Sequence, residues 1–379
     1  AVEPLSPADL RGQPPLVQAR RLARFCVVAD AAVPLDYEGV AAVLTPKLRP
    51  FLLTWFLAVY LQSPEDQLHP DVVENRLSAS AGFARVHGSE PLSTRPFLVV
   101  GHAGYRAAYF DPQPRAFLEA LSSGHLAPSF DALRTPSRPM RRPRIGTGGV
   151  GVLLTCWNEG HAVQRCLDPA LSGLRESGIR AYYLDGDLDH ARARLPAHWH
   201  DGPDSPVELR AFGLCRSPER LAAAARLIWR DDLDVLLFPE VGLTTASRWL
   251  STQRLARVQA AAYGHPVTTG SSAVDYFLGG QDVELTEGAS PEVAADRYSE
   301  RLVLLPGTGV STTPPPLPSS PRRRPLDPPR VLVASLSAAD KFCPSLLDTW
   351  SRIIEGADGA DLHLLPGLAP ARAQALAER

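Results

Sequence analysis

The sequence has few cysteines, and none of them lies in a pair suited to zinc. Its 379 residues include five cysteines, and no two are spaced as Cys-x-x-Cys. An odd number of scattered thiols argues against a disulfide scaffold or a zinc ribbon and favours a reducing compartment. His198 and His200 lie two residues apart without further ligands nearby, so we expect no metal site.

Long apolar runs and an excess of one charge are also missing. The most apolar segment, Leu52–Leu61, is far shorter than the about 20 residues that cross a bilayer. Basic residues number 39 and acidic residues 41, so no strong field favours nucleic acid or anionic membranes. The chain starts without Met, as a processed or cut polypeptide does, and has no secretory leader pattern. We therefore expect a cytoplasmic protein that binds neither nucleic acid nor membrane.

Proline is abundant and marks two linkers. The chain has 37 prolines, about twice the usual share, and they are dense in residues 135–144 and 311–329. The arginines of the first segment are more simply a solvated boundary than a phosphate-binding patch. We predict three domains, divided as 1–140, 141–322 and 323–379.

The first domain is predicted to be α-helical. Apolar residues recur at helical spacing in Val17–Ala31 and Val40–Leu61, and Pro114–Ser122 is a third candidate helix. Phe97–Val100 is a candidate strand. We find no 34-residue repeat and expect no tetratricopeptide array.

From Arg144 onward, short apolar runs alternate with helical spacing, which is typical of a parallel α/β sheet. Ligands of open α/β sheets bind at the carboxyl ends of the strands. We therefore predict a Rossmann-like lobe over 141–322, with strands at 150–155, 179–184, 235–238, 258–263 and 301–305, and helices at 162–177, 217–230 and 249–259.

Residues 323–379 restart the same rhythm. They contain candidate strands at 330–336 and 361–365 and candidate helices at 345–355 and 370–378. Two strands cannot bury the core of a doubly wound domain. We expect the start of a second Rossmann-like lobe that is cut short at Arg379.

Glu240 follows a predicted strand in Pro-Glu-Val-Gly, and its role has two readings. A lone carboxylate in such a loop suits a general base or an acceptor for sugar hydroxyls. It equally suits a side chain that bonds the amides of its own turn.

Gly264-His265-Pro266 follows the next predicted strand. The glycine allows close approach of the backbone and the proline stiffens the turn, so the segment suits a binding loop or a purely structural turn. The hydroxyls of Thr268 and Thr269 are able to bond sugar or diphosphate oxygens, or to cap a helix.

His161 lies in Asn-Glu-Gly-His-Ala-Val after the first strand of the α/β region. A loop histidine at a carboxyl end suits proton handling near neutral pH, and a solvated loop side chain is the alternative.

The stretch DVLLFPEVGLTT, with RLARVQAAAYGHPVTTGSSAVDYF after it, resembles the central motif of a glycosyltransferase family. That family contains O-GlcNAc transferase and the bacterial cytoplasmic protein N-glucosyltransferases. The resemblance covers the chain from about Arg144 to its end. It implies a GT-B fold, in which two Rossmann-like lobes face each other across a cleft, here preceded by the helical domain.

The resemblance also implies an activity. The family transfers a sugar, here GlcNAc or Glc, from a UDP-sugar to a Ser/Thr hydroxyl or Asn amide of a protein. The transfer inverts the anomeric centre and uses no metal or cofactor. His161 would line the acceptor side, and His265, with Gly264, Thr268 and Thr269, would lie beside the donor cleft.

Lys341 is one of only two lysines, the other being Lys47. The resemblance places it where the family has a lysine that pairs with the nucleotide diphosphate. A fixed ammonium there stabilises the charge of the leaving group. A surface lysine before a helix is the alternative.

Two other classes remain open. An inactive relative would act as a protein-binding module, and a UDP-sugar epimerase of GT-B type would turn over its substrate without a protein acceptor. The sequence indicates no oligomeric state.

Overall fold

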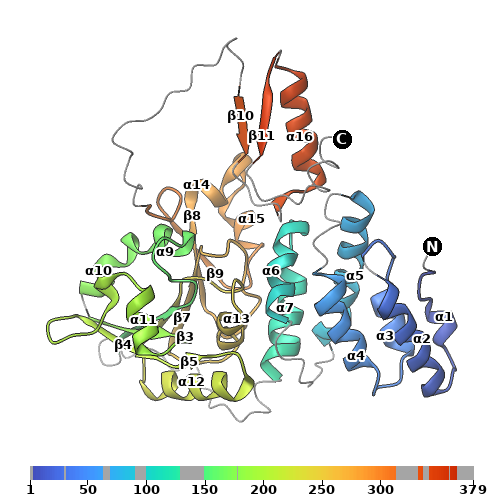
Figure 1. Cartoon of the computed structure of the whole chain (residues 1–379), viewed down its shortest axis with the longest axis horizontal. Helices are drawn as coiled ribbons and strands as arrows, with labels where there is room; N and C mark the ends of the chain where they lie inside the picture. The colour runs from blue at the N-terminus through green and yellow to red at the C-terminus, as the bar shows by residue number, and fades with distance from the viewer. Residues whose placement is uncertain are drawn as a thin grey trace.

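A computed structural model describes residues 3–29, 31–62, 69–89, 100–128, 149–176, 178–312, 332–335, 341–357 and 359–364. A row of helices leads to a parallel sheet flanked by helices, and two strands with one helix follow (Figure 1). The predicted α/β class and the helical segment before it are confirmed. The linker at 135–144, most of the linker at 311–329 and the helix at 370–378 lie outside the described residues.

The amino-terminal segment is helical throughout its described part. The predicted helix at Val40–Leu61 is interrupted, because Pro46 and Pro50 each remove a backbone donor and favour a new start. Of the candidate strand Phe97–Val100, only Val100 is described, and it begins a helix. The elements are α1 (Pro7–Leu10), α2 (Pro15–Val28), α3 (Tyr37–Val43), α4 (Arg49–Trp55), the π-helical turn η1 (Phe56–Tyr60), α5 (Pro70–Ser89), α6 (Val100–Phe110), α7 (Arg115–Glu119) and the π-helical turn η2 (Ala120–Leu126).

Seven parallel strands form the sheet, in the order β4-β2-β1-β6-β7-β8-β9. The chain runs outward from β1 to β4 and then returns to the other side of β1 to place β6. Sequence reasoning missed β4 and β8. The strands are β1 (Val150–Leu154), β2 (Ile179–Tyr183), β4 (Val207–Ala211), β6 (Val235–Phe238), β7 (Val258–Ala262), β8 (Tyr276–Gly280) and β9 (Arg301–Leu305).

The helices between these strands differ in how well the sequence located them. The predicted helix at 217–230 is confirmed, with the Ser217 hydroxyl accepting from the Arg220 amide and Pro218 in the first turn. The helix expected at 249–259 instead begins at Thr245, capped by Thr244, and ends at Ser251. The helices are α9 (Ala162–Leu167), α10 (Ser172–Glu176), α11 (Leu188–Arg194), α12 (Pro218–Arg230), α13 (Thr245–Ser251), α14 (Gln281–Glu284) and α15 (Pro291–Ala295).

The two faces of the sheet belong to two separate apolar cores. Because side chains alternate along a strand, Val152 and Leu154 of β1 pack with α9 and α11, while Leu153 packs on the opposite face. That opposite face is covered by α12 and α13.

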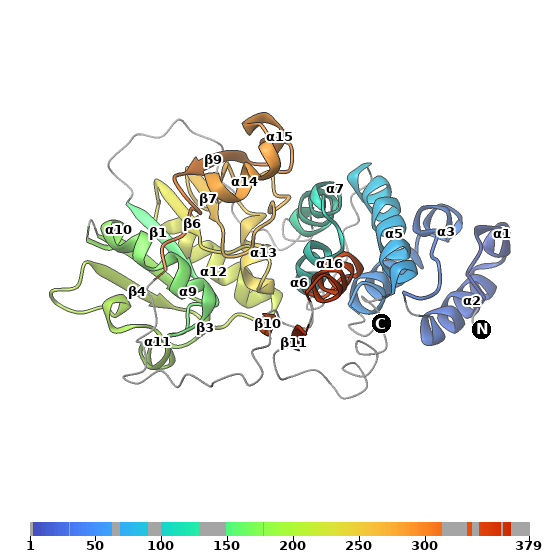
Figure 2. The same ribbon diagram turned by 90° about the horizontal axis from the view of Figure 1, so that it is seen from above.

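The helical segment joins the second of these cores. Leu118 and Phe83 belong to the same buried cluster as Leu153 and Trp249. Figure 2 shows α6 and α7 lying between the sheet and the remaining amino-terminal helices. The approach is close at Gly270, where an added Cβ would overlap the backbone of Leu118. The helices and the sheet therefore share one continuous core.

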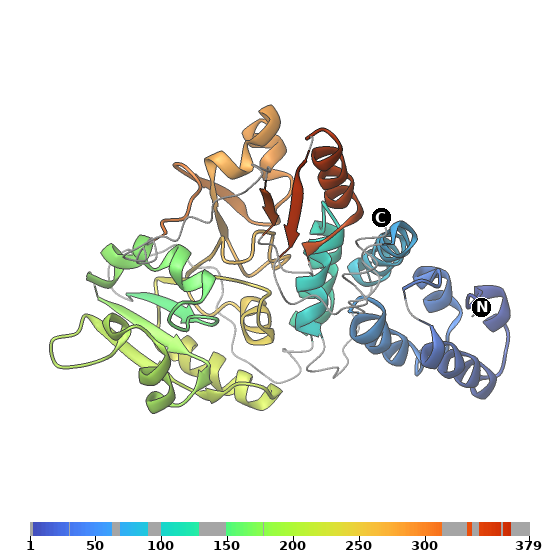
Figure 3. The same cartoon turned by 45° about the horizontal axis from the view of Figure 1, so that its top comes forward.

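A smaller unit follows the sheet. It consists of β10 (Leu332–Ser335) and β11 (Asp361–Leu364), paired in parallel, and α16 (Pro344–Glu355). Figures 1 and 3 show it next to α14, and in Figure 1 it lies above the sheet. No helix in the described ranges has the length and apolarity needed to cross a membrane.

The close packing at Gly270 predicts a large stability loss on substitution. Gly270 and Gly12 both have φ near +70°, but no atom lies within 4 Å of the Cβ position at Gly12. Gly12→Ala should cost about 1–2 kcal/mol for its left-handed backbone. Gly270→Ala adds overpacking against Leu118 and should cost at least about 2 kcal/mol more in urea unfolding. Equal losses would show that this contact contributes nothing.

Candidate functional site at the carboxyl edge of the sheet

The strand order reverses between β1 and β6, and this switch point defines the candidate site. Open α/β sheets bind ligands in the crevice outside such a point. The loops after β1, β6 and β7 meet there: the Gly264 amide donates to the Pro239 carbonyl at 3.0 Å. An added Cβ at Gly264 would also press on Val163 of α9.

Glu240 connects the loops after β1 and β6. Its carboxylate is fully buried and accepts hydrogen bonds from the Thr155 hydroxyl, the Leu243 amide (2.8 Å) and the Thr244 hydroxyl (3.2 Å). Burial raises the pKa of Glu240, and these donors oppose that rise. The geometry fits the structural alternative, a carboxylate that holds its turn, and a catalytic role for Glu240 stays a prediction.

His265 is buried beneath the same edge. Its Nδ1 lies 3.1 Å from the Val241 carbonyl, which can only accept, so Nδ1 carries the proton. Nε2 then has a lone pair and no partner in the described structure. Burial and the nearby Arg248 guanidinium lower the pKa of His265 to about 3, so the ring is neutral.

His161 has the opposite tautomer and lies exposed at the start of α9. Its Nδ1 accepts from the Val163 amide at 3.2 Å and caps the helix. Since a backbone amide can only donate, the ring proton of neutral His161 lies on Nε2. His161 therefore has a free hydrogen-bond donor at the exposed start of α9, and accepting a proton at Nδ1 would require loss of the cap.

Thr268 and Thr269 are buried on the segment that crosses back from β7 to β8. Both hydroxyls donate to the carboxylate of Glu300, which precedes β9. The Thr269 amide donates to the same carboxylate at 2.9 Å. Their donor capacity is thus used inside the protein, and contact with a sugar nucleotide stays a prediction.

Lys341 is exposed and lies between β10 and α16. The structure records no hydrogen bond or ion pair between its ammonium and any described residue. No recorded contact joins Lys341 to Glu240, His161 or His265.

Sequence reasoning missed two titratable groups at the switch point. Cys156 follows β1 with φ of 52°, a conformation that non-glycine residues rarely adopt. Burial, with Glu240 and Asp185 nearby, raises the pKa of its thiol to about 12, so it is no nucleophile at neutral pH. Asp185 begins the two-residue strand β3 (Asp185–Gly186), which follows β2, and burial raises the pKa of its carboxyl. In both cases the sequence signal for a site residue is a polar side chain shortly after a predicted strand.

Arg248 of α13 was also missed. Its guanidinium is fully buried and donates to the Thr269 carbonyl (3.1 Å) and the Ser122 hydroxyl (3.3 Å). Burial lowers its pKa to about 10, and Glu240 and Glu300 oppose the shift, so it is charged at neutral pH. Arg254 and Arg257 instead pair with Asp275 and Asp234 at the opposite, amino-terminal end of the strands.

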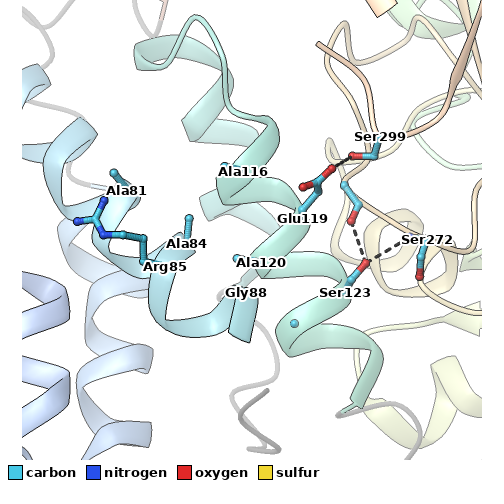
Figure 4. A pocket seen from close by; sticks show the side chains of 12 residues that line it. Ala81, Ala84, Arg85, Gly88, Ala116, Glu119, Ala120, Ser123, Ser272 and Ser299 are labelled. Atoms are coloured by element: carbon cyan, nitrogen blue, oxygen red, sulfur yellow. Dashed lines mark hydrogen bonds between the residues drawn. The ribbon is translucent and has the colours of Figure 1, made fainter. Parts of the chain in front are cut away.

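Two cavities lie where the helical segment meets the sheet. The larger, about 700 Å³, is lined mainly by alanines and glycines of α5, α7 and η2 (Figure 4). Ser299 donates to Glu119 at its rim, and Ser123 donates to the Gly270 carbonyl at 3.1 Å. The smaller, about 170 Å³, lies beside Pro266 at the carboxyl edge.

A search for metal ligands gives no candidate among the residues that the structure describes. No group of three or more His, Cys, Asp or Glu side chains is arranged to hold an ion there. His198 bonds Asp168 at 2.7 Å, whereas His200 bonds the Leu195 carbonyl at 3.1 Å. The two side chains therefore have separate partners.

No model of a known protein family matches the chain, and no curated protein sequence matches it. Among solved structures, a mutant of the O-GlcNAc transferase from Thermobaculum terrenum aligns with a TM-score of 0.49 and 21% identity. The alignment covers 96% of this chain and 68% of that one. A likeness at this level assigns no function, which has to come from the residues themselves.

The buried, neutral His265 predicts a specific pH dependence. Its pKa rises from about 3 in the folded state to the ordinary 6.5 on unfolding, so unfolding takes up a proton between these values. Stability is fully retained above pH 6.5 and falls on acidification by up to about 1.4 kcal/mol per pH unit from this group. His265→Asn keeps a donor for Val241 and should flatten the curve between pH 6 and 4. Parallel curves in urea unfolding would contradict the assignment.

Proposed function

We propose that this protein is a glycosyltransferase that moves a sugar from a UDP-sugar to a side chain of a protein acceptor. The observation that carries the proposal is the meeting of the Pro239–Leu243 and Gly264–His265 loops at the switch point of a parallel sheet. These loops contain the residues that resemble the transferase motif, and such a crevice is where α/β sheets bind nucleotides.

The proposed reaction is a single displacement. An acceptor oxygen or nitrogen attacks the anomeric carbon, and the bond between that carbon and the diphosphate oxygen breaks. The acceptor loses its proton to a base or to water. Such a reaction needs charge stabilisation on the departing diphosphate. Lys341 is the proposed cation, which requires its unit to approach the crevice when donor is bound.

The histidines are given different tasks in this proposal. Exposed His161 offers its Nε2 proton to an oxygen of donor or acceptor. Buried His265 holds the loop after β6 through Val241 and accepts no proton near neutral pH. Of the carboxylates near the crevice, Asp185 is partly exposed and has a raised pKa, so it is better suited than the fully bonded Glu240 to accept a proton.

Two other functions are distinguished by measurement. An inactive relative would act only as a protein-binding module, and titration calorimetry with UDP would show no heat. A UDP-sugar epimerase would consume UDP-sugar without modifying any protein. No geometric observation favours either over transfer.

The two lysines of the chain provide a matched test. Lys341→Ala should lower transfer of radiolabelled sugar from UDP-Glc or UDP-GlcNAc to Ser/Thr- and Asn-containing peptides by about 100-fold or more, because the leaving group loses its cation. Lys47→Ala removes an equally exposed lysine from the helical segment and should leave transfer unchanged. Full activity of Lys341→Ala would remove this residue from the mechanism. No transfer by the unmodified chain with either donor would refute the proposed function.

A further inference from the structure

The smaller cavity at the carboxyl edge contains a buried carboxylate and two tyrosines that the proposed transferase function does not use. It lies between the α6–α7 connection, the turn after β7, α14 and the segment that leads into β9. Pro112, Pro114 and Pro266 contribute apolar walls, and Tyr263, Tyr298 and Glu284 contribute polar groups. Its volume of about 170 Å³ is below the about 300 Å³ at which drug-sized sites begin, so it suits a single side chain.

Glu284 is the buried acidic residue of this cavity. Its side chain is only 3% exposed, and one carboxylate oxygen accepts from the Tyr298 hydroxyl at 2.6 Å. Among the described residues, no recorded hydrogen bond reaches its other oxygen and no basic side chain forms an ion pair with Glu284. Buried carboxylates are ordinarily paired with a cation or with several donors. The second oxygen is therefore available to a donor that enters the cavity.

Tyr263 adds a second unused polar atom. Its hydroxyl makes no hydrogen bond to the described residues, although the ring is half-buried. Tyr263 and Glu284 line the same cavity, where burial and the Glu284 carboxylate both raise the pKa of Tyr263. Tyrosine rings beside a carboxylate attract cations through ring faces as well as through charge.

One positive group, Arg297, also lines the cavity, and its charge opposes the rise in the pKa of Tyr298. Its side chain is exposed and forms no recorded ion pair with a described residue. Solvent screens the charge of an exposed side chain strongly. The carboxylate, by contrast, lies in the buried part, where attraction is screened least. The electrostatic preference inside the cavity is therefore for a positive group.

We propose that this cavity binds the ammonium or guanidinium of a basic side chain, with Glu284 as its counter-ion and Tyr263 as a hydrogen-bond partner. That this basic side chain belongs to an acceptor polypeptide rests on the proposed transferase function. The cavity adjoins the crevice, since Pro266 in its wall follows His265. On that basis the cavity selects acceptors with lysine or arginine near the modified residue.

The test measures binding directly and needs no transfer activity. The full chain, labelled with ¹³C in its tyrosine rings, is titrated with N-acetyl-arginine methylamide and N-acetyl-lysine methylamide while ring signals are recorded by NMR. Tyr263→Phe assigns the Tyr263 signal. Saturable shifts of the Tyr263 and Tyr298 signals are expected. The citrulline methylamide, which has the same shape without the charge, should bind about tenfold more weakly or not at all.

Matched variants separate charge from packing. Glu284→Gln keeps an acceptor for the Tyr298 hydroxyl and should weaken binding of the arginine probe about tenfold or more. The melting temperature of this variant shows whether it is folded. Asp282→Asn changes an exposed acid of the same short helix that does not line the cavity, and should leave binding unchanged. Arg297→Ala should leave affinity equal or improve it.

Several results would overturn the assignment. Equal binding of the arginine and citrulline probes would rule out recognition of charge, and loss of binding in Arg297→Ala would indicate an anionic or polyhydroxylated ligand. Shifts with free glucose or N-acetylglucosamine but not with the basic probes would make the cavity a sugar site. Binding of the basic probes by a chain that transfers no sugar would uphold the cavity while refuting the transferase function.

Discussion

The buried guanidinium of Arg248 is the interaction around which the rest of this structure is arranged. A charge removed from water is costly unless hydrogen bonds and opposite charges replace its hydration. Here Nη1 of Arg248 donates to the Thr269 carbonyl and the Ser122 hydroxyl, and the carboxylates of Glu240 and Glu300 supply the opposing charge. Nε and Nη2 have no hydrogen-bond partner among the described residues, so the compensation by hydrogen bonds is partial. These partners come from η2, from the loop after β6 and from the segments on either side of β8. One cation therefore fixes the helical segment and the crevice loops relative to each other.

The carboxylates around this cation each organise a loop. Glu240 gathers donors from the loops after β1 and β6, and Glu300 gathers both threonines of the Thr-Thr-Gly segment. Buried carboxylates therefore hold the crevice loops in place through hydrogen bonds, so the loop atoms that face solvent are positioned before a ligand binds. Preorganisation of this kind lowers the ordering cost of binding.

The sequence predicts the α/β elements where the apolar pattern is strong. β1, β6 and β7 are short apolar runs, and α12 combines a Ser-Pro start with a clear apolar stripe, so all four were located. β8 ends in Gly279 and Gly280, which disfavour a strand assignment, yet an added Cβ at Gly280 would overlap Thr308, and the site requires glycine. The break in the helix expected at Val40–Leu61 follows from Pro46 and Pro50, which lie inside that range.

Site residues were harder to assign, because their roles depend on distant partners. The strand ends correctly pointed to loops at the carboxyl edge, but the partner of Thr268 and Thr269 is Glu300, about thirty residues later. No local pattern shows that pairing. Likewise, the tautomers of His161 and His265 are set by the Val163 amide and the Val241 carbonyl, which only the folded backbone brings into reach.

The apolar cluster that runs from α4 and α5 through α7 and η2 to the sheet has a consequence for how this protein comes apart. A module with its own closed interior can be exchanged between proteins or melt before its neighbours. These helices have no such interior, since Leu118 and Leu121 are sealed in the same cluster as Leu153 and Trp249. Heat or denaturant should therefore unfold both parts in one cooperative transition. An excised helical fragment would expose a large apolar surface to solvent and would be prone to aggregate.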